Sequence, residues 1–147
     1  MGNIIMKLVN QCTYYKTVFG SPVMALMPEA WLELVASNYI DEYCRPFEYD
    51  EEAFVRYVNG AVVGFITFKD YDSVDFSNVI EVGIGYVRPP YRKKGWYAQL
   101  YNALKEEAAT RGKKFIWSSV WANNDAMLAH AKSQGRRIRY IGIEERI

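Results

Sequence analysis

The sequence predicts a single α/β (α+β) domain over residues 1–147, with a mixed, mostly antiparallel sheet flanked by helices. Three observations lead to this fold class. Half of the 147 residues are apolar and 16% are aromatic, which excludes a disordered chain. A chain of this length commonly folds around one core. Hairpin signals fill the first half, whereas strand and helix patterns alternate in the second half, an order that gives antiparallel strands first and parallel strands later.

The first 87 residues are predicted to form a short strand, a helix, a hairpin and a further strand. Pro28 and Glu29 suit the first turn of the helix, because proline lacks an amide there and the acid faces the positive end of the helix dipole. Arg45-Pro46 bounds the helix at its other end. Asn59-Gly60 is typical of a two-residue hairpin turn. The predicted strands cover residues 4–8, 53–58, 61–68 and 79–87, and a polar loop covers residues 70–78.

A long helix is the strongest pattern in the second half. Apolar residues recur at helical spacing over residues 97–108, and Gly112 ends the run. Residues 115–121 are predicted to form a buried strand. Asn123 or Asn124 then caps a helix that runs to about Gln134, and residues 136–145 resume as a strand.

Charge is distributed unevenly along the chain. Residues 1–87 hold five Lys/Arg and twelve Asp/Glu, whereas residues 88–147 hold thirteen Lys/Arg and five Asp/Glu. The basic half suits an anion such as phosphate and the acidic half a cation such as an amine; two ordinary solvated surfaces explain the split equally well. Two cysteines and one histidine are too few for a disulfide framework or a metal site. Without an apolar run of ~18–20 residues or a secretion signal, we expect a cytoplasmic protein with no membrane span.

A basic turn links the strand at residues 79–87 to the long helix. It contains Arg92, Lys93, Lys94 and Gly95. The first amides of a helix have no partner within it and the helix dipole is positive there, so the turn can bind an anion. A pyrophosphate fits this chemistry, whereas the glycine patterns of nucleotide P-loops and dinucleotide sites are absent. The alternative is a solvated basic turn.

This segment resembles the acetyl-CoA motif of the GNAT superfamily of N-acetyltransferases. The residues that match the motif without a gap are Val87, Pro89, Tyr91, Arg92, Lys94, Gly95 and Leu100. The sequence departs from the motif at Lys93, where the family usually has glycine, and at Tyr97, where it has a small residue against the pyrophosphate. Tyr97 either crowds the phosphates or turns into the helix–sheet core. A second, weaker match begins at Asn123 and places His130 where the family has a tyrosine.

The resemblance implies a splayed pair of parallel central strands, ending at residues 87 and 121, with the pantetheine arm of acetyl-CoA between them. The residues expected to bind the cofactor are Tyr86, Val87, Arg92, Lys93, Lys94, Gly95, Trp96, Tyr97 and Asn123. The acceptor would enter beside the first helix and the loop after it, where the acids are Glu29, Glu33, Asp41, Glu42, Glu48, Asp50, Glu51 and Glu52.

The implied reaction is direct transfer of an acetyl group to the primary amine of a small molecule or peptide. A free alkylamine has a pKa near ~10.4, so it must lose a proton before it attacks. Glu81 is the only acid in an apolar strand and is the predicted proton acceptor, while His130 is the predicted proton donor to the departing thiolate. Otherwise Glu81 is a strand-edge carboxylate bound by a neighbour, and His130 is a packing residue.

Two other functions fit the sequence. Tyr97 and Arg136 suggest a protein of this fold with lost or altered acyl-CoA use. A nucleic-acid-binding module would bring residues 92–94 and 136–139 to phosphates and stack tryptophans on bases, although the acidic first half makes nucleic acid an unfavourable partner. The sequence is compatible with a homodimer and does not identify the acceptor.

Overall fold

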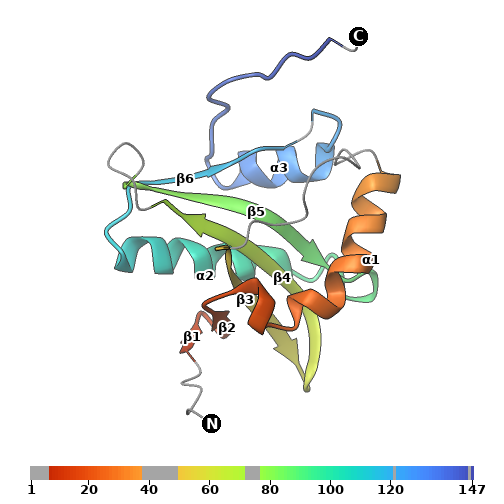
Figure 1. Cartoon of the computed structure of the whole chain (residues 1–147), viewed down its shortest axis with the longest axis vertical. Helices are drawn as coiled ribbons and strands as arrows, with labels where there is room; N and C mark the ends of the chain where they lie inside the picture. The colour runs from red at the N-terminus through yellow and green to blue at the C-terminus, as the bar shows by residue number, and fades with distance from the viewer. Residues whose placement is uncertain (1–6, 38–49, 72–76, 121, 146) are drawn as a thin grey trace.

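The computed structural model describes residues 7–37, 50–71, 77–120, 122–145 and 147, which form one six-stranded sheet with three helices (Figure 1). The sheet order follows the chain, and all neighbours are antiparallel except the parallel pair β5 and β6. The strands are β1 (Lys7–Val9), β2 (Cys12–Tyr15), β3 (Glu52–Val58), β4 (Ala61–Asp70), β5 (Val79–Val87) and β6 (Phe115–Ser118). The helices are α1 (Val23–Ala36), α2 (Trp96–Thr110) and α3 (Asp125–Ser133), with 3₁₀ turns at Val18–Gly20 and Pro89–Tyr91. The predicted fold class is confirmed.

The sheet has a hydrophobic core on each face. Leu100 and Leu104 of α2 are fully buried against one face, together with Phe54 of β3. On the other face, Val23 and Met27 of α1 pack into a second buried cluster. Figure 1 shows α2 and α1 on different sides of the strands. Each strand therefore sends alternate side chains to the α2 face and the α1 face.

A bulge in β5 reverses this alternation halfway along the strand. Ile66 of β4 pairs with Gly85, but Phe68, two residues later, pairs with Val82, so β5 holds one extra residue. Val82 consequently packs in the α2-side core, whereas Ile84 packs in the α1-side core. The bulge therefore places β5 residues that precede the extra residue and β5 residues that follow it next to one another at the centre of the α1 face.

The parallel strands β5 and β6 part at the bulge. Their register runs from Val79 opposite Phe115 to Val82 opposite Ser118, where β6 ends, while β5 continues to Val87. Figure 1 shows the two strands close together at one end and diverging toward the other. A splayed parallel pair is thus present, and it opens beside the bulge.

Sequence periodicity located most elements of this sheet. The hairpin turn at Asn59-Gly60 and the strand over residues 79–87 are confirmed, as are the long helix and the cap at Asn124. The helix predicted to open at Pro28 instead begins at Val23, with Pro28 inside it. Burial of Val23, Met27 and Ala30 on one helix face offsets the cost of about 3 kcal/mol that proline adds within a helix. The predicted end at Arg45-Pro46 lies outside the described residues.

The two ends of the sheet compare differently with the predictions. Of the strand predicted over residues 4–8, residues 7 and 8 lie in β1, which Asn10 and Gln11, both with positive φ, join to β2 in a hairpin; residues 4–6 lie outside the described part. The strand predicted over residues 136–145 was wrong. Residues 136–145 form no strand and lead away from the sheet in Figure 1. Alternating apolar and charged residues favour a strand, but a strand also needs a neighbour to pair with. β6 ends at Ser118, and Phe115 is 54% exposed at the sheet edge.

Among the residues that the structure describes, no helix has the length and hydrophobicity needed to span a bilayer.

Candidate functional site

An open helix N-terminus follows the splayed end of β5. Gly95 is the N-cap of α2 and adopts a left-handed conformation with φ 81°, and Lys93 is also left-handed with φ 63°. No side chain caps the helix, and within the described residues the amides of Lys93, Lys94 and Gly95 donate no hydrogen bond. A Cβ added to Gly95 would meet nothing within 4 Å. The turn therefore presents free amides and two exposed lysines to solvent, an arrangement that binds anions.

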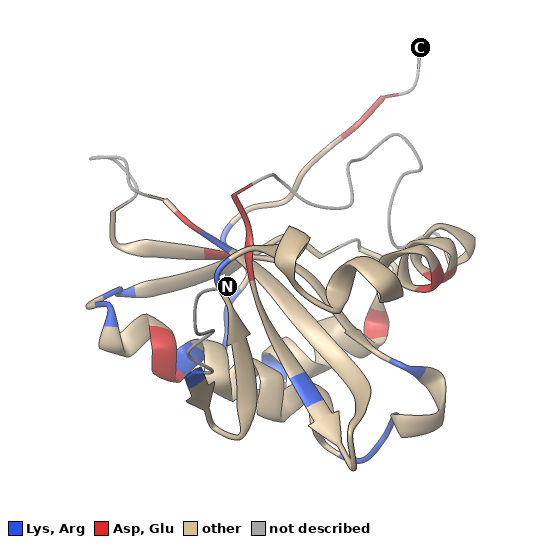
Figure 2. Cartoon of the chain, turned by 60° about the horizontal axis from the view of Figure 1, so that its bottom comes forward, with Lys and Arg blue, Asp and Glu red and all other residues tan. Residues whose placement is uncertain are grey.

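Arg92 ties this turn to α1. Its two terminal nitrogens donate to Glu33 at 2.6 Å each, and its Nε donates to the carbonyl oxygen of Val87 at 2.8 Å. The hydrogen bond from Arg92 lowers the pKa of Glu33, so this pair is ionised at neutral pH. In Figure 2 the acidic positions of α1 lie beside the basic positions after β5. Arg92 thus positions the turn, and the charge free to meet an anion is that of Lys93 and Lys94.

Tyr97 turns toward the sheet. A Cβ added to Gly85 of β5 would come within 2.9 Å of the phenol oxygen and 3.0 Å of Cζ, and closer still to Cε2. On its other side the ring meets His130 of α3 edge to face, with centroids 4.8 Å apart. Burial raises the pKa of Tyr97 to about 12, so the phenol is protonated. The bulky ring that departs from the family pattern fills the helix–sheet interface.

His130 lies between Tyr97 and Tyr101, whose ring centroid is 5.8 Å away. Burial, with a contribution from Arg136, lowers the pKa of His130, so the imidazole is neutral at neutral pH. Its Nε2 is buried and has no hydrogen-bond partner among the described residues. A buried ring nitrogen of this kind is commonly satisfied by water or ligand.

Glu81 lies on the α1 face, because it is one residue from Ile80 and Val82 on the α2 face. It is half-buried and accepts a hydrogen bond from the hydroxyl of Tyr71 at 3.0 Å. Its register partner on β6 is Trp117, so Glu81 belongs to the paired part of β5, before the strands part.

The remaining predicted cofactor residues are distributed around the turn. Tyr86 faces α1, and its hydroxyl donates to Glu29 at 3.1 Å. Val87 is buried in the α2-side core. Trp96 lies under the guanidinium of Arg56, 4.9 Å from its ring centroid, so its indole faces β3. Asn123 is exposed just before α3, where Asn124 is the cap that accepts from the amide of Met127.

The sequence placed Glu51 among the acids of the acceptor approach but did not predict that it is buried beside the bulge. Glu51 is 4% exposed and Thr67 is fully buried. The hydroxyl of Thr67 donates to Glu51 Oε1 at 2.9 Å and accepts from the amide of Ile84 at 2.8 Å. The alternation of the next strand, carried back to Glu51, would have placed it on the α1 face.

The predicted acidic approach to the acceptor is only partly present. Glu29 and Glu33 pair with Arg88 and Arg92, respectively, and Asp50 is 3.6 Å from Lys69. Glu52 is on the opposite face of the sheet, bound to Arg111 at 2.6 Å. Asp41, Glu42 and Glu48 lie outside the described residues. Glu51 and Glu81 are therefore the described acids of the α1 face that lie nearest the strand divergence.

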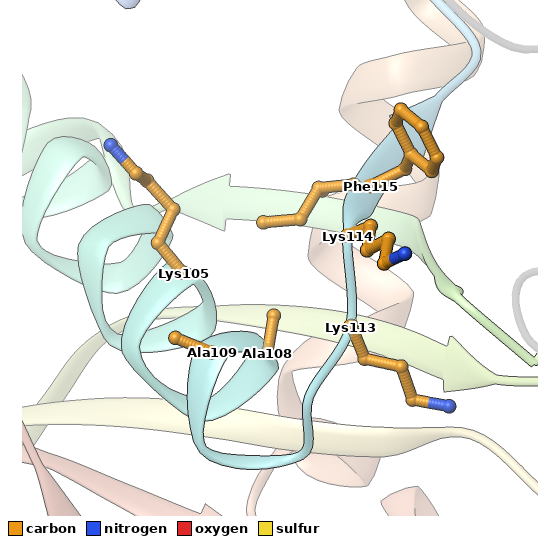
Figure 3. A pocket seen from close by; sticks show the side chains of 7 residues that line it. Lys105, Ala108, Ala109, Lys113, Lys114 and Phe115 are labelled. Atoms are coloured by element: carbon orange, nitrogen blue, oxygen red, sulfur yellow. The ribbon is translucent and has the colours of Figure 1, made fainter.

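A pocket at the far end of α2 does not belong to this site. It is lined by Lys105, Ala108, Ala109, Lys113, Lys114, Phe115 and Ile116. Figure 3 shows Lys105 pointing to one side and Lys113 and Lys114 pointing to the other. Lys113 is already 2.6 Å from Asp70. Its α2 residues Lys105 and Ala109 lie about 14 Å and about 20 Å along the helix from Trp96, so the pocket is well separated from the open N-terminus.

Comparison with known proteins adds a sequence relative. The L-amino acid N-acyltransferase MnaT of Escherichia coli strain K12 is 33% identical over 78 residues, which are 52% of this chain. The chain matches 45% of the length of that relative.

Solved structures share the fold. An aminoglycoside acetyltransferase from an uncultured soil metagenomic sample matches with a TM-score of 0.69 at 10% identity, over 94% of this chain and 97% of the other. An aminoglycoside N-acetyltransferase in complex with CoA matches with a TM-score of 0.55 at 20% identity, over 66% of each chain. The model of the GNAT acetyltransferase family matches residues 21–135, which include α1, α2, α3 and the parallel strand pair around the open turn. On this match, the chain belongs to the GNAT acetyltransferase family.

Proposed function

We propose that this protein transfers an acetyl group from acetyl-CoA to a primary amine held beside α1, in a complex that contains both substrates. The observation that carries the proposal is the uncapped N-terminus of α2, with its left-handed Gly95 and free amides, placed where the parallel strands part. Membership of an acetyltransferase family and the CoA complex of a structural relative support it.

The residues present fit acetyl-CoA. The amides of residues 93–95 and the charges of Lys93 and Lys94 would hold its pyrophosphate. Beyond Val82, the backbone of β5 has no registered partner on the β6 side among the described residues and would bind the pantetheine amides. Tyr97 packs against the sheet at Gly85, and Gly95 has open space in front of it, so the phenol leaves the amides accessible. Acetyl-CoA supplies the activated acetyl group.

Because the acceptor amine is protonated, the protein must remove a proton from it before it can attack. An alkylamine with a pKa near ~10.4 is almost fully protonated at neutral pH and cannot attack. We assign proton removal to Glu81, directly or through a water, and donation of a hydrogen bond to the departing thiolate to the neutral imidazole of His130. Holding the amine and the thioester together would supply most of the rate.

Isothermal titration calorimetry with acetyl-CoA tests the donor site. Gly95→Glu is expected to abolish binding, because the side chain adds a negative charge at the free amides. Gly112→Glu is a matched control: Gly112 also has a positive φ and open space around it, but lies at the other end of α2. We expect a micromolar complex for the wild type and for Gly112→Glu. No detectable heat for the wild type at millimolar acetyl-CoA would end the proposal.

Steady-state kinetics on a panel of primary amines test the chemistry. Glu81→Gln is expected to leave acetyl-CoA binding unchanged and to slow turnover by about 10²–10⁴-fold. Unchanged turnover across the pH range would remove Glu81 from the role of proton acceptor.

A further inference from the structure

An exposed apolar segment, residues 137–145, follows α3 and is called the tail below. All of its residues are exposed, and none belongs to a helix or strand. Its last two residues, Glu144 and Glu145, form no ion pair with the described residues. Contiguous exposed apolar groups mark interaction surfaces. The large apolar residues of the tail, each between 73% and 94% exposed, are Ile138, Tyr140, Ile141 and Ile143.

The tail crosses the outer edge of its own sheet and does not follow that edge. Just before the tail, the guanidinium of Arg136 lies on the α2 face, 5.0 Å from the ring centroid of Tyr101. Three residues later, the guanidinium of Arg139 lies 4.3 Å from the ring centroid of Trp117. Trp117 is the register partner of Glu81 on the α1 face. Beyond this point the tail leads away from the sheet (Figure 1), on the side opposite to α2.

An open groove remains at this sheet edge on the α2 side. It is the pocket between the C-terminal end of α2 and the start of β6 (Figure 3), and its volume is about 170 Å³. Since an apolar cavity of ~150 Å³ holds a benzene molecule, the groove has room for one aliphatic side chain. Lys105 and Lys114 are exposed beside it and form no ion pair with the described residues. Its apolar lining consists of Ala108, Ala109, Phe115 and Ile116.

The backbone of β6 also faces outward beside the groove. The amide of Phe115 donates to the carbonyl oxygen of Asn78 on the β5 side at 3.1 Å, so the N–H and C=O of the next residue, Ile116, point to the outer edge. The carbonyl of Ile116 accordingly accepts from the side chain of Arg136 at 3.3 Å. An outward-facing strand edge of this kind can pair with an extended chain. The groove is therefore suited to an extended segment that carries apolar and acidic side chains.

We propose that the tail of a second copy of this chain occupies the groove, and that two copies exchange their tails to form a dimer. Ile143 enters the apolar lining, and the two acids after it lie against Lys105 and Lys114. The charges of tail and groove are complementary, which favours this occupant. The tail of the same chain does not fit, because at Arg139 it has already passed to the opposite face of the sheet.

The length and symmetry of the exchange are consistent with a dimer. Extended, residues 140–145 span about 20 Å, which is enough to reach a neighbouring copy. A standard interface buries about 800 Å² on each partner, and the exchange places an exposed tail and an open groove of each copy in the interface. Because each copy gives one tail and receives one, the assembly closes at two copies. This inference does not depend on the proposed acetyl transfer.

Sedimentation equilibrium of the full chain tests the dimer, which is expected at twice the chain mass of 17.0 kDa. Glu144→Lys with Glu145→Lys reverses the charge of the tail, and Lys105→Glu with Lys114→Glu reverses that of the groove. Each pair of substitutions alone is expected to raise the dimer Kd about 10–100-fold, because like charges then meet in both grooves. Lys16→Glu with Lys132→Glu is the matched control: it makes the same change in net charge at exposed lysines outside the groove, and the Kd is expected to stay unchanged.

Mixing the tail variant with the groove variant identifies the occupant. In a heterodimer of the two, each reversed tail meets a reversed groove and each native tail meets a native groove, so both contacts regain opposite charges. The mixture is therefore expected to dimerise with a Kd within about 3-fold of the wild type. A tail bound to the groove of its own chain would not be rescued by mixing.

Ile143→Asp tests the apolar contact and decides the matter if a charge-reversed variant fails to fold in thermal melts. Its Kd is expected to rise about 100-fold or more, because two isoleucines leave the interface of each dimer. A wild type that remains monomeric at about 100 μM would overturn the inference. So would a dimer whose Kd none of the tail variants changes, a control as damaging as the reversals, a mixture that is not rescued, or an assembly larger than two copies.

Discussion

The contact between Gly85 and Tyr97 is open to a direct stability test. An alanine at position 85 would place its methyl group 2.9 Å from the phenol oxygen and 3.0 Å from Cζ, whereas ordinary van der Waals contact lies at 3.4–4 Å. The ring must move out of the space between β5 and His130 to admit it. Inserting a methyl group into a packed interface of this kind costs about 1–3 kcal/mol, which we expect for Gly85→Ala.

Removing the ring should remove most of this cost. Tyr97→Ala alone is expected to destabilise the protein by about 3 kcal/mol, the lower end of the range for large aromatic residues, because Tyr97 is partly exposed. In that background Gly85→Ala is expected to cost less than about 0.5 kcal/mol, which gives a coupling energy of about 1–2 kcal/mol. Urea unfolding of the four proteins of the cycle measures this coupling.

Gly64→Ala supplies the matched control for the cycle. A methyl group at Gly64 would lie 2.6 Å from the backbone oxygen of Tyr86, so Tyr97 has no part in that clash. Its cost should be the same with and without the Tyr97 ring. If Gly85→Ala were equally costly in both backgrounds, the ring would not occupy the space against β5, and the explanation of how a bulky residue fits this helix would fail.

Two further perturbations test ion pairs, one beside the site and one at the other end of α2. The pKa of Glu33 is held below its usual 4.5 by the hydrogen bond from Arg92, so the pair stabilises the fold above that pH, and its contribution is lost as the pH falls through the lowered value. The difference in melting temperature between wild type and Glu33→Gln is therefore expected to shrink from about pH 6 to about pH 3, and a constant difference would contradict this assignment. Arg111 contacts Glu52, Glu107 and Asp70 and is 22% exposed, so Arg111→Met should cost about 2–4 kcal/mol in urea unfolding, somewhat less than a fully buried pair. The exposed Arg139→Met is its control, and a comparable cost for both would mean that the Arg111 network adds nothing to stability.

Local sequence signals were sufficient to predict an element wherever particular residue types favour one backbone conformation. Asn59-Gly60 defined a hairpin because its positive φ angles of 51° and 80° match the turn that these residues favour. Pro28 indicated the wrong start of the first helix, because burial of the helix face around it outweighed the local cost of proline. Residues 136–145 misled because strand propensity does not supply a pairing partner.

The same distinction between local and long-range signals applies to the candidate site. The anion-binding turn was predicted, because a basic segment before a helix carries its chemistry in consecutive residues. The buried carboxylate was not, because three adjacent acids have three different surroundings: Asp50 is exposed, Glu51 is buried on the α1 face and Glu52 binds Arg111 on the other face. The bulge that assembles Glu51, Thr67 and Gly83 results from pairing between β4 and β5, which composition does not reveal.

The uneven charge of the two halves of the chain has a structural explanation. Of the eight ion pairs among the described residues, five join an acid from residues 1–87 to a base from residues 88–147. Most of the paired charge therefore holds the two halves together and is not free for a partner. Lys93 and Lys94 take part in none of these pairs, and they lie at the free amides of α2. Other described bases, such as Lys105, Lys132 and Arg137, also take part in none of these pairs. The position of Lys93 and Lys94 beside free helix amides, rather than the overall charge balance, therefore favours an anion at this turn.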